Sequence, residues 1–171
     1  HQEAERQVQR AAESKLFAEQ ALARAEKLAL ALAERAATDA AEGRMEHARQ
    51  GFAEATVGTN HLDVLRLASA FYSDTGDLRA AKQILKRHLE ILGDEELLER
   101  AHVLQRLGTV HCEAREFSQA ERKALEALGI YSDLGEERFV AQQESELGLI
   151  YLAQAKLPES KAALKRAGDK F

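Results

Sequence analysis

The residues of this sequence that could support chemistry are six histidines and a single cysteine. Histidine and cysteine side chains bind a metal ion where several of them converge on one point. His102 and His111 are nine residues apart, and this spacing places them on nearly opposite sides of a helix. No His-x-x-x-His pair occurs, and Cys112 has no second thiol to join it. We therefore predict that the chain has no metal site and needs no cofactor.

Cys112 directly follows His111, as a nucleophile could follow its base. Adjacent residues of a helix point about 100° apart, so these two side chains do not meet. We interpret His111 and His88 as packing residues and Cys112 as an inert thiol. The sequence has no phosphate-binding loop, because its glycines are interpreted as helix ends at Gly43, Gly76, Gly93, Gly129 and Gly135. We predict that the chain is not an enzyme.

Composition limits the class of protein further. The 171 residues are 45% hydrophobic and 31% charged, enough to bury a core, and their net charge is -5. Lysine and arginine are dispersed rather than clustered, which argues against nucleic acid as a partner. No apolar run approaches the roughly 20 residues of a membrane span. The single cysteine favours a cytoplasmic location, and a start at His1 instead of methionine suggests a fragment of a larger protein.

A repeated pattern gives the architecture. Two segments that begin forty residues apart have small and large residues at the same positions: "LGTVHCEAREFSQA" (107–120) and "LGLIYLAQAKLPES" (147–160). Four sets of residues follow the same spacing of three, four and three, which is one face of a helix. These sets are Met45, Ala48, Phe52, Ala55; Leu78, Ala81, Leu85, His88; Phe117, Ala120, Ala124, Ala127; and Leu157, Ser160, Leu164, Ala167. Each set predicts the second helix of a two-helix hairpin.

These hairpins resemble tetratricopeptide repeats over about residues 29 to 168. The offset from Gly43 to Gly76 is 33 residues, and the later offsets, Ser69 to Gly108 and Gly108 to Gly148, are 39 and 40. Units of the longer size resemble those of kinesin light chains and of bacterial regulators. The resemblance implies an all-α fold, a right-handed α-solenoid of antiparallel helix hairpins, with about four helix pairs in residues 29–171.

Two parts of the chain depart from this pattern. Asp39 stands where the first hairpin should have a large aromatic residue, and Arg35 where it should have an apolar one. Pro158 falls in the first turn of a helix, where proline is tolerated.

Residues 1–28 are predicted to extend the first helix, with a break near Ser14 as an alternative to one continuous helix. A heptad seam runs through Ala18, Leu22, Ala25, Ala29, Leu32 and Ala36. The seam either caps the solenoid or forms a coiled coil between two chains.

The resemblance also implies a binding groove lined by the first helix of each hairpin. Carried onto this sequence, the groove consists of Asp63, Arg66, Ser73, His102, Gln105, Thr109, Glu113, Gln142, Ser145 and Leu149. Because this set lacks a cluster of lysine and arginine, an acidic C-terminal peptide is a disfavoured ligand. The predicted function is a protein–protein or peptide interaction module within a larger bacterial regulatory or scaffold protein.

The alternative function is homo-oligomerisation, for example as a homodimer. It would use either the N-terminal helix or the last hairpin, in which Leu149, Ile150, Leu152 and Leu157 leave an unusually apolar surface. We expect some of these side chains to point outward and to be covered by a second copy or by a further helix.

Overall fold

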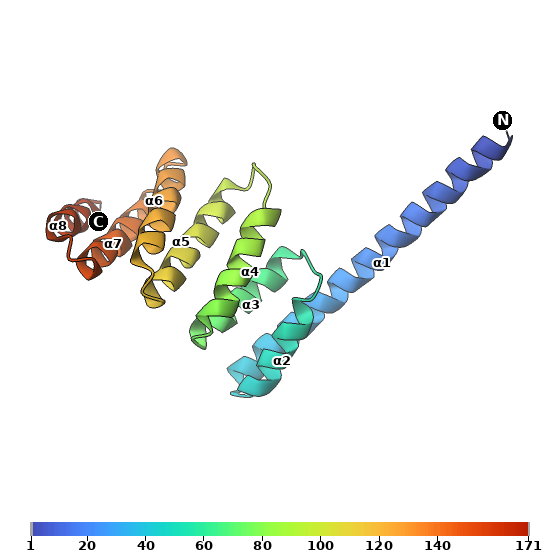
Figure 1. Cartoon of the computed structure of the whole chain (residues 1–171), viewed down its shortest axis with the longest axis horizontal. Coiled ribbons are helices and arrows are strands. Elements are labelled where there is room, and N and C mark those ends of the chain that lie inside the picture. The colour runs from blue at the N-terminus through green and yellow to red at the C-terminus, as the bar shows by residue number, and fades with distance from the viewer. Residues whose placement is uncertain (1, 171) are drawn as a thin grey trace. The chain divides into compact units, whose positions relative to one another are not determined.

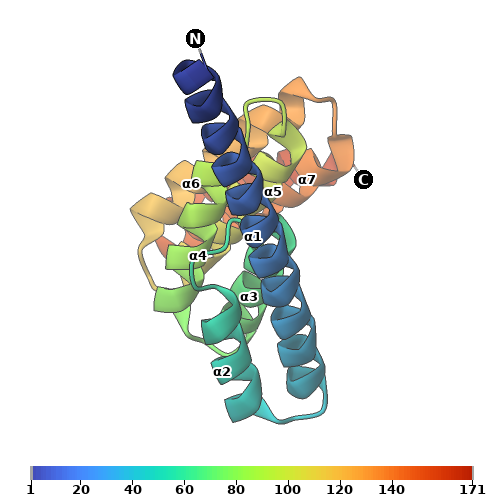
Figure 2. The same cartoon turned by 90° about the vertical axis from the view of Figure 1, so that its right-hand side faces the viewer.

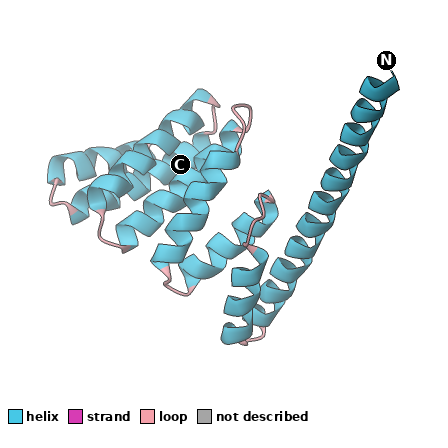
Figure 3. Cartoon of the chain, turned by 45° about the vertical axis from the view of Figure 1, so that its right-hand side comes forward, coloured by secondary structure: helices cyan, strands magenta, loops and turns pink. Residues whose placement is uncertain are grey.

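The computed structural model describes residues 2–170, and these residues form helices and short connections without any strand (Figure 3). The prediction of an all-α chain is therefore confirmed. The helices are α1 (Gln2–Ala41), α2 (Met45–Ala55), α3 (Leu62–Asp74), α4 (Leu78–Ile91), α5 (Leu97–Glu113), α6 (Phe117–Asp133), α7 (Glu137–Ala153) and α8 (Leu157–Gly168).

The chain divides into two compact units, His1–Ala68 and Ser69–Phe171, with the division inside α3. The first unit contains α1, α2 and the beginning of α3. The second contains the end of α3 and helices α4 to α8. From the sequence we predicted a boundary at residue 28, between an N-terminal helix and the solenoid. This boundary would lie inside α1, and it stays a prediction.

In the first unit, the C-terminal part of α1 and α2 form an antiparallel hairpin (Figure 2). The buried side chains of this hairpin include the small residues Ala33, Ala36 and Ala48 and the aromatic ring of Phe52. A Cβ atom added to Gly51 would lie 2.8 Å from the Cβ of Ala36, so the two helices approach as closely as a glycine permits.

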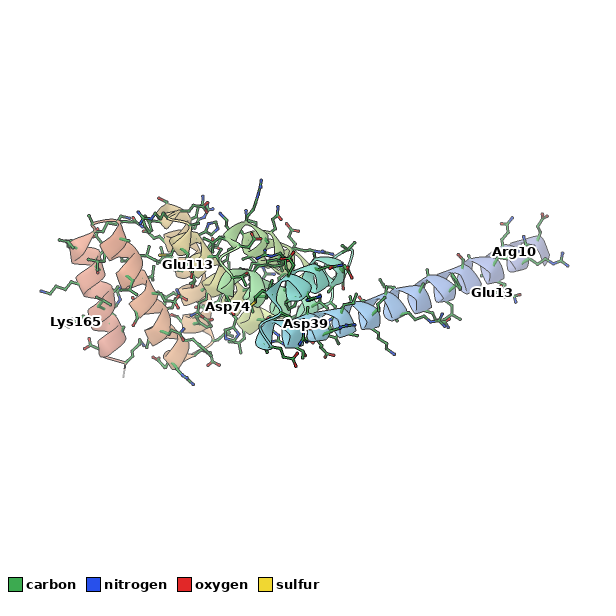
Figure 4. All side chains as sticks on the ribbon, turned by 90° about the horizontal axis from the view of Figure 1, so that it is seen from below. Arg10, Glu13, Asp39, Asp74, Glu113 and Lys165 are labelled. Carbon is green, nitrogen blue, oxygen red and sulfur yellow. The ribbon has the colours of Figure 1, made fainter. Side chains whose placement is uncertain are left out.

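The N-terminal part of α1 extends beyond α2 as one unbroken helix, without a break at Ser14 (Figure 1). Ala29 is the first buried residue among the described side chains of α1, whereas Ala18, Leu22 and Ala25 are exposed. The heptad seam is thus divided, since Ala29 and Ala36 are buried and Leu32 is half-buried, whereas the earlier seam residues are exposed. Arg10 and Glu13 project from the exposed part (Figure 4).

The turn inside each hairpin needs one residue in the left-handed conformation. Gly43 and Gly76 take this role in the first two hairpins, with φ of 78° and 75°. Arg115 and Ala155 take it in the last two, with φ of 58° and 59°, although a side chain disfavours that conformation. The next residue is the N-cap, and the following helix begins two residues after the left-handed one. Pro158 lies in the first turn of α8 as predicted.

The interpretation of Gly129 as a helix end was wrong, because Gly129 lies inside α6. The other glycines of that set lie in connections between helices. A longer helix forms here because the apolar spacing continues through Gly129 to Tyr131, which is fully buried.

In the second unit, α4 to α8 pack in succession, each helix against the next (Figure 1). One apolar cluster joins α5, α6 and α7 through Leu104, Ala127, Tyr131 and Val140. A second cluster joins α6, α7 and α8 through Ala124, Leu147, Ile150 and Ala163. Stacking of each hairpin on the next therefore supplies the core that a single hairpin lacks.

Candidate partner-binding surface

A chain of hydrogen bonds fixes the face that α5 and α7 present. The Tyr131 hydroxyl donates to Gln105 Oε1 over 2.9 Å, and Gln105 Nε2 donates to Glu146 Oε1, also over 2.9 Å. Glu146 further accepts from Gln143 Nε2 at 3.2 Å and from Gln142 Nε2 at 3.4 Å. One carboxylate of α7 thus receives three amide donors, one of them from α5.

Tyr131 anchors this network from α6. Its ring stacks on Phe139, and the ring of His102 meets Phe139 edge-on. Burial raises the pKa of the Tyr131 hydroxyl far above its ordinary value, and the nearby carboxylates of Glu146 and Glu99 add to the shift. The hydroxyl therefore stays protonated and remains a donor to Gln105.

Two of the predicted groove residues are consequently engaged inside the protein. His102 lies half-buried against Phe139 and Tyr131, and its Nε2 atom is buried without a hydrogen-bond partner. Gln105 uses its amide nitrogen and its amide oxygen for internal bonds. Sequence reasoning placed both residues on the right helix but did not reveal these contacts, because Tyr131 and Phe139 come from other helices.

The more accessible part of the predicted set comes from α5 and α7. Thr109, Glu113, Gln142 and Leu149 are exposed, and Ser145 is half-buried (Figure 4 labels Glu113). The hydroxyls of Thr109 and Ser145 bond to carbonyl oxygens one turn back in their own helices. Glu113, Gln142 and Leu149 thus offer a carboxylate, an amide and an apolar surface.

The remaining predicted residues lie on α3, on both sides of the division between the units. Asp63 and Arg66 belong to the first unit and form an exposed ion pair of 3.1 Å. Ser73 belongs to the second unit and is half-buried. The role of Asp63, Arg66 and Ser73 as groove residues stays a prediction.

Cys112 is half-buried, and burial raises the pKa of its thiol, with the carboxylates of Glu113 and Glu146 acting in the same direction. A raised pKa leaves less thiolate, which is the reactive form. Within residues 2–170, no group of three or more His, Cys, Asp or Glu side chains is arranged to hold a metal ion. None of the helices in that range is both long and apolar enough to cross a membrane.

Sequence reasoning missed the polar links between neighbouring hairpins. Lys82 Nζ of α4 lies 2.6 Å from Glu116 Oε1, and the other oxygen of Glu116 lies 2.5 Å from His111 Nδ1. Glu121 Oε2 of α6 accepts from Lys156 Nζ at 2.8 Å and from Gln154 Nε2 at 2.9 Å. His111 is buried as predicted, but it is also part of a polar junction.

Comparison with known proteins identifies the fold. No protein-family model and no curated protein sequence matches this chain. Among solved structures, MamA is similar with a TM-score of 0.68 and 17% identity, over 83% of this chain and 77% of that one. A second structure of MamA gives a TM-score of 0.51 and 15% identity, over 86% and 92% of the two chains.

BtubC (BKLC) from P. vanneervenii is also similar, with a TM-score of 0.51 and 18% identity, over 92% of this chain and 85% of that one. At such low identity the likeness shows the fold alone. MamA is a protein that contains tetratricopeptide repeats, and this chain accordingly has an all-α helical repeat fold that is similar to such repeats.

Proposed function

We propose that this chain is a non-enzymatic interaction module that binds a segment of another protein on the face formed by α5 and α7. The observation that supports the proposal is the Gln105–Glu146 bridge, which holds the two helices in register. Around the bridge, Glu113, Gln142 and Leu149 stay exposed. A preorganised face of this kind loses little entropy when a ligand binds.

The chemistry of the face indicates what kind of segment it suits. Beside its bond to Glu146, the Gln142 amide keeps a second N–H donor and its carbonyl acceptor for a peptide backbone, and Glu113 accepts hydrogen bonds. Leu149, together with the exposed Leu152, offers apolar contact. The carboxylates of Glu113 and Glu146 would repel an acidic segment, so we expect neutral or basic peptides.

The experiment is a selection of peptides from a random 12-residue library, followed by NMR mapping of the bound peptide on the labelled full chain. We expect shifts at the amides of Thr109, Gln142 and Leu149. Leu149→Arg should weaken binding at least tenfold, whereas Leu125→Arg, the same change at an exposed leucine of α6, should leave it unchanged. Undiminished binding by the Leu149→Arg chain would place the site elsewhere.

Homodimerisation through α1 is the second candidate function. Ala11, Ala18, Leu22 and Ala25 form an exposed apolar stripe on the part of α1 that extends beyond α2. Such a stripe is the seam of a coiled coil, although alanine buries little area. Sedimentation at several concentrations would show a dimer that Leu22→Lys abolishes, and a wild-type monomer at every concentration would refute this candidate.

We also propose that the chain belongs to a larger bacterial regulatory or scaffold protein of the cytoplasm. The longer spacing of its later hairpins and its lone cysteine support this context. Detection of the parent protein by antibody in fractionated cells would test the location.

A further inference from the structure

Glu146 of α7 is a half-buried carboxylate on the α5–α7 face. Its two oxygens accept hydrogen bonds from the side chains of Gln105, Gln142 and Gln143, which are neutral amides. Within residues 2–170, no lysine, arginine or histidine forms an ion pair with Glu146. The negative charge of Glu146 is therefore held in place by hydrogen bonds but is not neutralised.

The other carboxylates of α6 and α7 that are removed from water differ from Glu146 in this respect. Glu144 is 6% exposed, and its two oxygens accept hydrogen bonds of 2.7 and 2.8 Å from the guanidinium of Arg166. Glu121 is half-buried and pairs with Lys156 over 2.8 Å. A charge that is partly removed from water is unfavourable unless it is paired. Glu146 is the one that still lacks a cation among the residues described.

Gln143 supplies a second acceptor beside Glu146. The Gln143 residue is 0% exposed, and its Nε2 donates to Glu146 Oε2 over 3.2 Å. Its Oε1 atom is buried and has no hydrogen-bond partner among residues 2–170. Because Oε1 and Nε2 belong to one amide group, the unpartnered oxygen lies close to the carboxylate. A buried acceptor without a donor is unfavourable, so the two side chains together call for a ligand that is both positively charged and rich in donors.

The charge of Glu146 also acts on side chains of the neighbouring helices. Burial raises the pKa of the Tyr131 hydroxyl on α6, and the carboxylate of Glu146 raises it further. Burial likewise raises the pKa of the Cys112 thiol on α5, with Glu113 and Glu146 acting in the same direction. A cation beside Glu146 would act in the opposite direction on both groups. The effect of the unpaired carboxylate thus extends over the α5–α7 face.

We propose that Glu146 and Gln143 bind one arginine side chain of the protein segment that docks on the α5–α7 face. This inference rests on the proposed function and names the residue that the segment must carry. A guanidinium has five N–H donors in one plane, so it can bond to the carboxylate and to the amide oxygen together. Since the oxygen of Gln143 is buried, its amide group turns toward the arginine as the segment binds.

The surroundings of Glu146 define the segment further. Leu149 lies about one helical turn beyond Glu146 and is 60% exposed, so an apolar residue near the arginine would contact it. Lysine carries its charge on a compact ammonium group without the planar fork of arginine, and we expect it to bind less tightly. A neutral side chain would leave the charge of Glu146 unpaired beneath the bound segment.

The experiment runs the selection of 12-residue peptides in parallel on four versions of the full chain. The wild type should select peptides that are enriched in arginine. Glu146→Gln removes the charge, and Gln142→Arg places a cation one turn from Glu146 within the chain, so both should select peptides without this enrichment. Glu90→Gln, at an exposed carboxylate of α4, is the matched control and should select the same peptides as the wild type.

A selected peptide is then synthesised with citrulline, the neutral analogue of arginine, and with lysine at the same position. Binding to the wild-type chain, measured by calorimetry, should weaken at least tenfold with citrulline and less with lysine. In NMR spectra, the side-chain amide of Gln143 should shift with the arginine peptide and stay in place with the citrulline peptide. Circular dichroism should show that Glu146→Gln is folded, and Gln142→Arg tests the same charge by a change at an exposed position.

The outcomes separate this inference from the function on which it rests. Peptides that bind the α5–α7 face without arginine enrichment, or a citrulline peptide that binds as tightly as the arginine peptide, would overturn the inference alone. Failure of every chain to select a peptide would overturn both. The net charge of -5 attracts basic peptides in general, so equal enrichment by Glu146→Gln and Glu90→Gln would also overturn the inference. Free L-arginine that shifts the Gln143 amide as strongly as the peptide would show that the site takes the amino acid instead of a protein segment.

Discussion

The α1–α2 hairpin and the α5–α6 hairpin make the same turn contact with different chemistry. In the first, Asp39 accepts a hydrogen bond of 2.8 Å from Nε of Arg44, the N-cap of α2. In the second, His111 occupies the position of Asp39 and bonds to Glu116, the N-cap of α6. These two hairpins therefore share a polar pair at the same two positions, with the carboxylate on opposite sides of the turn.

The two hairpins differ more in how their helices meet. In the α1–α2 hairpin, Gly51 lies against Ala36, and a cleft of about 190 Å³ opens beside them, lined in part by Arg35 and Asp39. In the α5–α6 hairpin, the large ring of Tyr131, near the end of α6, packs with Leu104 of α5 and Val140 of α7. The comparison therefore sets the small-residue contact between Gly51 and Ala36 against the aromatic packing of Tyr131.

The largest effect is expected in the aromatic layer. Tyr131→Ala should destabilise the chain by about 3–5 kcal/mol, because it leaves a cavity among Phe139, His102 and Leu104. Tyr131→Phe should cost only about 1 kcal/mol, the value of the lost hydrogen bond to Gln105. Urea unfolding of both variants measures the difference. If both variants lost a similar free energy of unfolding, the hydroxyl, and not the ring, would be what stabilises this region.

A smaller loss is expected in the small-residue contact. Gly51→Ala should destabilise by about 1–3 kcal/mol, because its Cβ would force α1 and α2 apart. Gly129→Ala is the control, since a Cβ there meets no atom within 4 Å, and it should stabilise α6 by about 0.5–1 kcal/mol. If Gly51→Ala melts at or above the wild-type temperature, the close approach is not what stabilises this hairpin.

The polar pair of the α5–α6 hairpin predicts a pH dependence. Hydrogen bonds from Lys82 and His111 lower the pKa of Glu116 below its ordinary value of 4.5. The ionised carboxylate therefore stabilises the fold above pH 4.5, and this contribution is lost as the pH falls through the lowered pKa. Glu116→Gln should melt below the wild type at pH 6, with the difference shrinking toward pH 2. Glu95→Gln, in the exposed loop before α5, is the control. A difference in melting temperature that stays constant from pH 6 to pH 2 would contradict the lowered pKa of Glu116.

The smallest effect concerns the turns. Glycine stands at the left-handed position of the α1–α2 turn, whereas Arg115 stands there in the α5–α6 turn. Arg115→Gly should relieve about 1–2 kcal/mol of strain and lose part of it to greater freedom of the unfolded chain. We expect a net gain of about 0.5 kcal/mol by thermal unfolding. A loss in melting temperature would mean that the arginine side chain makes a contact worth more than the strain.

The sequence by itself determined the helices, the hairpins and their register. Apolar residues at spacings of three and four, and glycines such as Gly43 and Gly76 at the turns, are local signals that act within a few residues. The departure of Asp39 from the repeat pattern was evident in the sequence for the same reason. The predicted groove residues lie on α3, α5 and α7, and their role stays a prediction. The exposure of Glu113, Gln142 and Leu149 and the internal engagement of His102 and Gln105 were not evident from the sequence.

Only the tertiary structure decided which polar side chains meet. Gln105 and Glu146 are 41 residues apart, and Lys82 and Glu116 are 34 apart. No local period marks such pairs, because their contact depends on how one hairpin rotates and slides on the next. The same stacking buries Leu85 and Ala124 and leaves their counterpart Leu164 exposed, although all three occupy one position of the repeat. Whether a residue at this position is buried depends on the hairpin that stacks on it. The repeat pattern describes only the hairpin to which the residue itself belongs.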